Sequence, residues 1–189
     1  MTTRLLLIVH AGTAATRAAR FALDEGLDEW GQADAAAAAG SLDARARLTC
    51  GRALRCRQTA AALQGGPLPA ADALDGRLDD WGLGSWAGRT LAEVGTQDPA
   101  GIQAWLEDPH AAPHGGESLA RLLTRVGSYL TDVAQRPGHH IAVTHAAIVR
   151  GAVVHVLGAP PAGFWRIDVV PLTRVLLTAY AGRWNLRLP

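Results

Sequence analysis

The sequence has only two cysteines and almost no net charge, and each scarcity excludes a class of protein. Cys50 and Cys56 cannot supply a disulfide framework, and they do not form a CxxC pair. The chain carries 18 Lys+Arg residues against 17 Asp+Glu residues, and no basic run interrupts this balance. A dedicated nucleic-acid-binding protein usually has a basic excess or a basic stretch. We therefore expect no nucleic-acid partner, and any bound anion must be held by locally placed arginines.

Long hydrophobic runs are also missing. The longest, at 5–9 and 35–39, are far shorter than the roughly 20 apolar residues of a membrane-spanning helix. The N-terminus has one arginine before a short apolar stretch and no small-residue cleavage site, so it does not predict a signal peptide. We expect a cytoplasmic protein with no membrane partner.

Length and element pattern predict an α/β protein. A chain of 189 residues suits one domain with a full core, so residues 1–189 are expected to form a single domain. The patterns predict strands at 5–9, 47–50 and 141–145, helices at 32–39, 53–63, 117–135 and 147–157, and one or two strands in the last thirty residues. Such alternation favours a three-layer α/β/α sandwich around a mainly parallel sheet.

The middle of the chain reads differently. Residues 76–89 are rich in Gly, Asp and Trp and are expected to form a loop, and two short helices are expected after it. We interpret 76–116 as a lid or a substrate-facing insertion. Its tryptophans and histidines could line that lid, and these are Trp81, Trp86, Trp105, His110 and His114. We expect most of them to serve in packing.

Two histidines stand at equivalent positions of two predicted strands. His10 follows the strand at 5–9 and His145 ends the strand at 141–145, and small residues follow each. Ligands bind beyond the carboxyl ends of the strands in open α/β sheets. A single histidine in such a place is usually a partly buried ring whose nitrogens are hydrogen-bonded, with no functional role. Two of them favour a shared site.

An arginine and a carboxylate complete a candidate site. Helical spacing places Arg52 and Arg55 on one face and turns Arg57 away, and the middle loop carries the paired Asp79 and Asp80. Two histidines, an arginine and a carboxylate fit phosphoryl transfer to a histidine nucleophile. A metal site is the alternative, but HxH and HExxH spacings are missing and the arginines would repel a cation. We expect no metal.

Five short motifs, in order along the chain, resemble those of the histidine phosphatase superfamily, which has the phosphoglycerate-mutase-like fold. VHAGTAATRAARF is similar to its Arg-His-Gly-Glu-Thr signature, and LRCRQTA to its Arg-x-x-Gln-Thr segment. DDWGLGSWAG resembles the Glu-x-x-x-Gly-x-Trp-Glu-Gly loop. PHGGES resembles a Gly-Gly-Glu-Ser stretch, and VTHAAIVR a Ser-His-Gly-Gly-x-x-Arg motif. The resemblance covers almost the whole chain.

The resemblance implies a role for each matching residue. His10 would be the phosphorylated nucleophile, Arg55 and His145 would bind the phosphoryl group, and Asp80 would be the acid/base group. The implied substrate-binding residues are Thr13, Arg17, Arg20, Gly116, Glu117, Ser118 and Ala146. The implied reaction is hydrolysis of a small phosphomonoester without any cofactor. The compact chain resembles broad-specificity, α-ribazole-type or sugar-phosphate phosphatases more than glycolytic mutases.

The chain also departs from this family pattern. Val9 replaces the arginine before the nucleophile, Asp80 replaces the commoner glutamate, and Ala146 and Ala147 replace glycines. Losing a charged donor to the transferring group costs about 3–4 kcal/mol, or a rate factor on the order of 10²–10³. We therefore expect a weak or specialised phosphatase. The alternative is a non-catalytic member that binds a phosphate ester or a protein partner.

Overall fold

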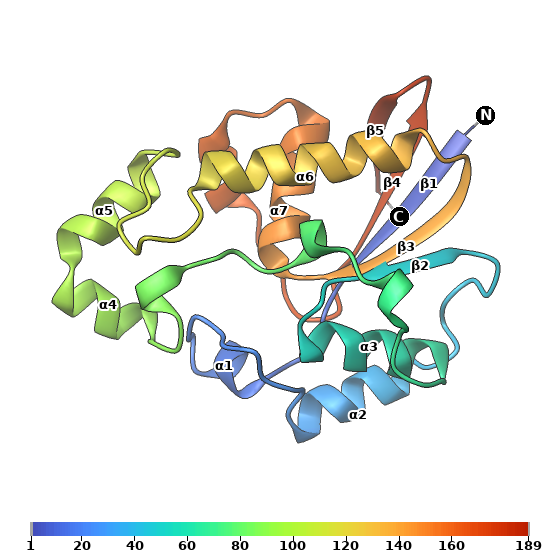
Figure 1. Cartoon of the computed structure of the whole chain (residues 1–189), viewed down its shortest axis with the longest axis horizontal. Helices are drawn as coiled ribbons and strands as arrows, with labels where there is room; N and C mark the ends of the chain where they lie inside the picture. The colour runs from blue at the N-terminus through green and yellow to red at the C-terminus, as the bar shows by residue number, and fades with distance from the viewer. Residues whose placement is uncertain (1, 189) are drawn as a thin grey trace.

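A five-stranded sheet runs through the middle of the computed structural model, which describes residues 2–188 (Figure 1). The strands are β1 (Thr2–Val9), β2 (Arg47–Cys50), β3 (Gly138–Thr144), β4 (Arg174–Tyr180) and β5 (Arg183–Arg187). Their order in the sheet is β2-β3-β1-β4-β5. β2, β3 and β1 run parallel, whereas β4 and β5 form an antiparallel hairpin at one edge. The predicted α/β class with a mainly parallel sheet is confirmed.

Helices cover both faces of this sheet, as Figure 1 shows. The α-helices are α1 (Ala14–Arg17), α2 (Glu29–Ala37), α3 (Leu54–Gln64), α4 (Leu91–Gln97), α5 (Pro99–Glu107), α6 (Leu119–Ala134) and α7 (Ala146–Leu157). Short 3₁₀ turns are η1 (Ala71–Ala73), η2 (Gly76–Leu78), η3 (Gly84–Trp86) and η4 (Pro161–Arg166). Within residues 2–188, no helix combines the length and apolar character that a bilayer crossing requires.

Alternating side chains of β1 divide the core into two layers. Leu7 and Val9 pack in the larger apolar cluster, which contains the buried residues of α6 and α7. Ile8 points to the opposite face and packs with Cys56 and Leu63 of α3. Because successive strand residues face opposite sides, a sheet covered on both faces needs the continuous apolar run that opens this sequence.

Capping side chains set several helix starts. Asp28 accepts a hydrogen bond from the backbone N–H of Gly31 at 2.7 Å, so α2 begins earlier than predicted. Thr90 and Glu93 form a capping box at α4, and Asp98 caps α5. α4 and α5 lie at the end of the molecule away from the β4–β5 hairpin (Figure 1).

Candidate active site

His10 lies immediately beyond β1, where the chain leaves the sheet. Its backbone N–H donates to the carbonyl of Thr144 at the end of β3 at 2.8 Å, which joins the two parallel strand ends. Its Nδ1 lies 2.8 Å from the carbonyl oxygen of Ala11. A carbonyl only accepts, so Nδ1 carries the proton and Nε2 keeps a lone pair when the ring is neutral.

Burial keeps the His10 ring neutral. Its surroundings lower the pKa of His10 from 6.5 to about 4, mainly through burial and then through the nearby His145 and Arg55. The Ala11 carbonyl and the Asp80 carboxylate oppose this shift but do not overcome it. At neutral pH the ring is therefore an unprotonated base with one free nitrogen.

His145 is the second imidazole of the site and occupies the N-cap of α7. Its ring centroid lies 5.1 Å from that of His10, with the planes inclined by 69°. Its Nε2 lies 3.3 Å from Sγ of Cys56, whose pKa is raised well above its ordinary value by burial. A neutral thiol can donate to Nε2, which leaves the proton of the His145 ring on Nδ1.

The other nitrogen of His145 faces the site. Nδ1 lies 3.3 Å from Oδ2 of Asp80 but is not aligned for a hydrogen bond. Within residues 2–188 it has no hydrogen-bond partner, although it is buried. Such a buried, unpaired donor is costly, and an oxyanion in the site would satisfy it.

Arg55 and Asp80 form an ion pair beside the two rings. Nη2 of Arg55, a buried residue of α3, lies 2.9 Å from Oδ2 of Asp80, and Nη1 donates to the carbonyl of Leu23 at 2.7 Å. Oδ1 of Asp80 accepts from the backbone N–H of Trp81 at 2.8 Å. Burial opposes ionisation of Asp80, but His145, Arg55 and this N–H hold the pKa of Asp80 well below its usual range.

An arginine that the sequence analysis missed holds the Asp80 loop. Arg125 of α6 donates from Nη1 to the carbonyls of Arg77 and Asp79, each at 2.9 Å. Its Nε and Nη2 make a bidentate pair with Glu117 at 2.8 and 2.6 Å. Nothing in the local sequence around Arg125 indicates this role, because its partners are distant in the chain.

Three of the catalytic candidates, His10, Asp80 and His145, open into one pocket of about 260 Å³, whose lining does not include Arg55. It is lined by His10, Thr16, Arg20, Phe21, Ala22, Asp80, Trp81, Leu83, Trp105, His145, Ala146, Ala147, Arg150, Phe164 and Trp165. Arg20 and Ala146 are thus the predicted substrate-binding residues that line it. Across the described residues, no group of three or more His, Cys, Asp or Glu side chains is arranged to hold a metal ion.

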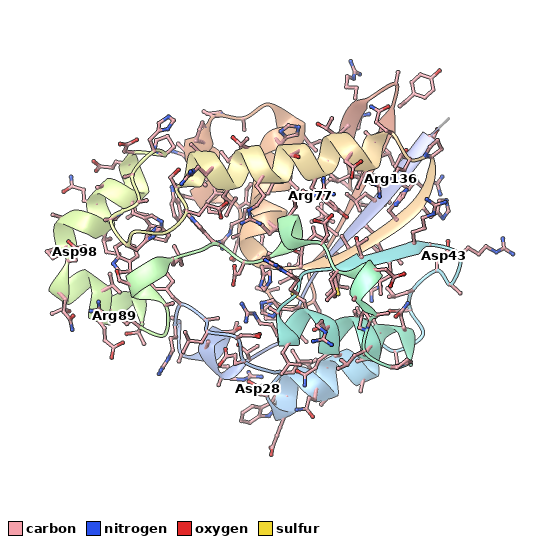
Figure 2. All side chains as sticks on the ribbon, viewed as in Figure 1. Asp28, Asp43, Arg77, Arg89, Asp98 and Arg136 are labelled. Atoms are coloured by element: carbon pink, nitrogen blue, oxygen red, sulfur yellow. The ribbon has the colours of Figure 1, made fainter. Side chains whose placement is uncertain are left out.

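The structure places two other predicted substrate-binding residues outside this pocket. Thr13 caps α1 and donates to Glu25 at 2.7 Å. Arg17 pairs with Asp28, which is labelled in Figure 2, and its guanidinium stacks on the ring of Trp30 at 4.6 Å. Both side chains shape the loop that follows His10.

The segment before α6 also has structural partners. Glu117 pairs with Arg125, and Ser118 caps α6 by accepting from the N–H of Arg121. Gly116 lies so close to Gly82 that an added Cβ would be 1.9 Å from the Gly82 carbonyl oxygen. Gly116 and Glu117 thus contact the Asp80 loop and the arginine that holds it, whereas Ser118 caps α6, and none of the three lines the pocket.

Val9 also lies outside the pocket lining. It is buried in the larger core cluster. The guanidinium groups that line the pocket are those of Arg20 and Arg150, and neither makes an ion pair within residues 2–188. Nε of Arg150 donates to the carbonyl of Ile167 at 2.8 Å. Arg150 is the last residue of the VTHAAIVR motif, so this position could have been found from the sequence.

The protein is a mainly parallel α/β sandwich in which two adjacent strand ends each carry a histidine beside an arginine–carboxylate pair. This combination defines a phosphoglycerate-mutase-like protein. The model of the histidine phosphatase superfamily (branch 1) matches residues 5–189, and the chain belongs to this superfamily.

Several relatives of the chain are named as phosphatases. It is 30% identical to a glucosyl-3-phosphoglycerate phosphatase of Mycolicibacterium vanbaalenii over 175 residues, which cover 83% of this chain and 75% of the relative. It is 33% identical to phosphoserine phosphatase 1 of Hydrogenobacter thermophilus over 85 residues, which cover 43% of this chain and only 40% of that protein.

Solved structures share the whole fold. A mycobacterial glucosyl-3-phosphoglycerate phosphatase superimposes with a TM-score of 0.83 at 26% identity, over 98% of this chain and 97% of the other. It has also been solved in complex with VO3. A protein described as mycobacterial hydrolase 1 gives a TM-score of 0.84 at 26% identity and covers 100% of this chain.

Proposed function

We propose that this protein hydrolyses small phosphomonoesters through a phosphohistidine formed at His10. The observation that carries the proposal is the orientation of the His10 ring. Nδ1 donates to the Ala11 carbonyl, so Nε2 has a lone pair for attack on phosphorus. Because the pKa of His10 is about 4, no base is needed to deprotonate it near neutral pH.

In the free site, Asp80 lies beside the two donors that a phosphoryl group needs. It accepts from Nη2 of Arg55, and its Oδ2 lies 3.3 Å from Nδ1 of His145, which has no hydrogen-bond partner within residues 2–188. An entering phosphoryl dianion takes Nη2 from the carboxylate and gives Nδ1 an acceptor. Losing this partner and gaining a negative neighbour raises the pKa of Asp80. Substrate binding would therefore convert Asp80 into the carboxylic acid that the leaving group requires.

The reaction then follows in two displacements. In the first, the bond from His10 Nε2 to phosphorus forms as the ester P–O bond breaks, and Asp80 gives its proton to the leaving oxygen. In the second, the Asp80 carboxylate takes a proton from water, whose oxygen bonds to phosphorus as the N–P bond breaks. Arg55 and His145 neutralise the remaining phosphoryl oxygens in both steps.

Two arginines are proposed to compensate for Val9. Arg20 and Arg150 line the pocket, and within residues 2–188 neither guanidinium is neutralised by a carboxylate. Guanidinium groups suit phosphate oxygens in charge and geometry. With these groups and Arg55 supplying positive charge, the scheme uses no metal ion.

The segment 76–116 is proposed to cover the substrate within a single domain of residues 1–189. It contributes Asp80, Trp81, Leu83 and Trp105 to the pocket lining. The acid/base group and much of the apolar wall would thus come from one insertion, whereas the phosphate-binding groups come mainly from the sheet and its helices.

The test is hydrolysis of 4-nitrophenyl phosphate by the wild-type protein, without added metal, beside His10→Ala. We expect turnover by the wild type and none by His10→Ala. His155→Ala is a matched control, because His155 is an exposed imidazole outside the pocket lining, and this variant should behave as wild type. Rapid quenching should trap one acid-labile phosphoryl group on the peptide that contains His10.

Two results would contradict the proposal. Equal turnover by His10→Ala would remove the nucleophile from the scheme. Phosphate binding by the wild type without hydrolysis of any monoester would instead support the non-catalytic, phosphate-binding alternative.

A further inference from the structure

One wall of the pocket is built from aromatic rings that come from distant parts of the chain. Phe21 follows α1, Trp81 follows Asp80, and Trp105 lies on α5. Phe164 and Trp165 belong to η4. Four separate segments thus bring five rings to the lining of the pocket that also contains the two histidines.

These rings are packed against each other and are held firmly. The centroids of Trp105 and Trp165 are 4.6 Å apart, those of Trp81 and Trp105 are 5.1 Å apart, and those of Trp81 and Trp165 are 5.8 Å apart. Phe164 is buried behind them, whereas Phe21 and Trp165 remain partly exposed. A rigid, partly exposed aromatic surface loses little conformational entropy when it contacts a ligand.

The polar groups of the pocket leave little to hold a hydrophilic leaving group. Apart from the catalytic candidates, the polar lining residues are Thr16, Arg20 and Arg150. Asp80 is the single carboxylate of the lining, so an ammonium group would find no free acidic partner. The lining tryptophans offer indole N–H donors and no acceptors, and Nε1 of Trp105 is buried without a partner within residues 2–188. Ammonium groups, and hydroxyl groups that must donate, would lose hydrogen bonds to water there without replacement.

The size of the pocket sets a further limit. Its volume is about 260 Å³. A dry cavity of about 150 Å³ is enough to bind benzene. One ring and a phosphoryl group therefore fill this pocket, and a disaccharide-sized leaving group would extend outside it.

We propose that the leaving group of the natural substrate is an alcohol or phenol that carries a single apolar ring, which packs against the partly exposed rings of Phe21 and Trp165. The proposal rests on the phosphatase activity proposed above and names its substrate class. The specificity for this ring comes from Trp165, Phe21 and Trp105. The phosphoryl group is bound by Arg20 and Arg150.

A pair of non-hydrolysable ligands tests this without requiring turnover. Calorimetry would measure the Kd of wild-type protein for 2-phenylethylphosphonate and for ethylphosphonate, which share the phosphonate and differ by the ring. Burying one phenyl ring should tighten binding by about 10- to 100-fold. Equal Kd values would overturn the inference, and they would leave the proposed phosphatase activity untouched.

Variants and esters then locate the effect. In Trp165→Ala the ratio of the two Kd values should fall at least about fivefold. Trp30→Ala removes an exposed tryptophan outside the pocket lining and should keep the wild-type ratio. In hydrolysis, kcat/KM should be higher for 2-phenylethyl phosphate than for ethyl phosphate, whose leaving alcohols have similar basicity. A higher kcat/KM for phosphoserine or 3-phosphoglycerate than for the phenylethyl ester would also overturn the inference.

Discussion

The protonation state of His10 is set by the few groups that enclose it. Its ring is 9% exposed and hydrogen bonds to the Ala11 carbonyl, and its pKa is about 4 against 6.5 for an ordinary histidine. Between pH 4 and pH 6.5, His10 therefore binds a proton in the unfolded chain but not in the folded protein. Stability conferred by the neutral ring is complete above pH 6.5 and is lost as the pH falls through about 4.

This linkage predicts a difference between wild-type protein and His10→Asn. The asparagine amide can donate to the Ala11 carbonyl but does not titrate. Between pH 7 and pH 4 the free energy of unfolding of the wild type should fall by up to about 3 kcal/mol more than that of the variant. Urea unfolding at several pH values measures it, and parallel curves would show that His10 titrates normally.

Replacing Asp80 should change kcat and the affinity for phosphate in opposite directions. Asp80→Asn removes the general acid, so kcat for an alkyl phosphate should fall about 10²-fold or more. It also removes a negative charge from the oxyanion site, so inhibition by inorganic phosphate should tighten about tenfold.

Asp79→Asn is the control for this measurement, because Asp79 pairs with the exposed Arg52 and does not line the pocket. It should leave kcat and phosphate inhibition near the wild-type values. If Asp80→Asn weakened phosphate binding, the carboxylate could not be the competitor of the phosphoryl group.

Residues of the site differ in how visible they are in the sequence. His10, Arg55, Asp80 and His145 could be selected because each lies in a short motif at a strand or helix end. Arg125 could not, since its role comes from carbonyls more than forty residues away that the fold brings to α6. Thr13 and Ser118 occupy motif positions, yet their side chains cap helices.

At the scale of elements, the loop after β1 and helix α2 meet at two glycines. An added Cβ at Gly31 would lie 2.0 Å from the carbonyl oxygen of Gly12, two residues after His10. The first turn of α2 therefore sets the position of the loop that begins at the nucleophile.

Gly31→Ala should separate α2 from this loop. We expect a loss of about 1–3 kcal/mol in the free energy of unfolding and a lower kcat, because the displaced backbone adjoins His10. Gly95→Ala is the matched control, since Gly95 lies within α4 and no atom lies within 4 Å of its added Cβ. It should raise stability by about 0.5–1 kcal/mol, as urea unfolding would show.

The starts of α4 and α5 can be seen in the sequence, whereas the start of α2 at the Asp28 cap was predicted three residues too late. Thr90 and Glu93 stand at capping-box spacing where α4 begins, and Asp98 followed by Pro99 stands where α5 begins. Strand direction was less visible. Strand–helix alternation predicts parallel strands, but it gives no direction for the final thirty residues, which form the antiparallel β4–β5 hairpin. The ion pair between Arg77, which is labelled in Figure 2, and Asp132 of α6 also joins segments far apart in the chain.

For the whole molecule, the site depends on segments from nearly the full length of the chain. His10, Arg55, Asp80 and His145 converge only when the sheet and its helices are assembled. The unfolded chain therefore has no oxyanion site, and a ligand of that site must stabilise the folded state by mass action.

Inorganic phosphate at 100 times its Kd should raise the free energy of unfolding by about 2.7 kcal/mol. For a domain of this size the melting temperature should rise by roughly 5–10 °C. Sodium chloride at the same ionic strength is the control and should produce a much smaller shift. Equal shifts with both salts would assign the effect to general screening and not to the pocket.

The aromatic wall has an optical consequence. Trp81, Trp86, Trp105 and Trp165 form a chain of rings with successive centroids 4.6–5.8 Å apart, whereas Trp30 and Trp184 lie elsewhere. At such spacing, excitation energy migrates between indoles before it is emitted. Four of the six tryptophans therefore share excitation energy, and three of them, Trp81, Trp105 and Trp165, line the pocket. The intrinsic fluorescence of the unlabelled protein will report when that pocket is filled.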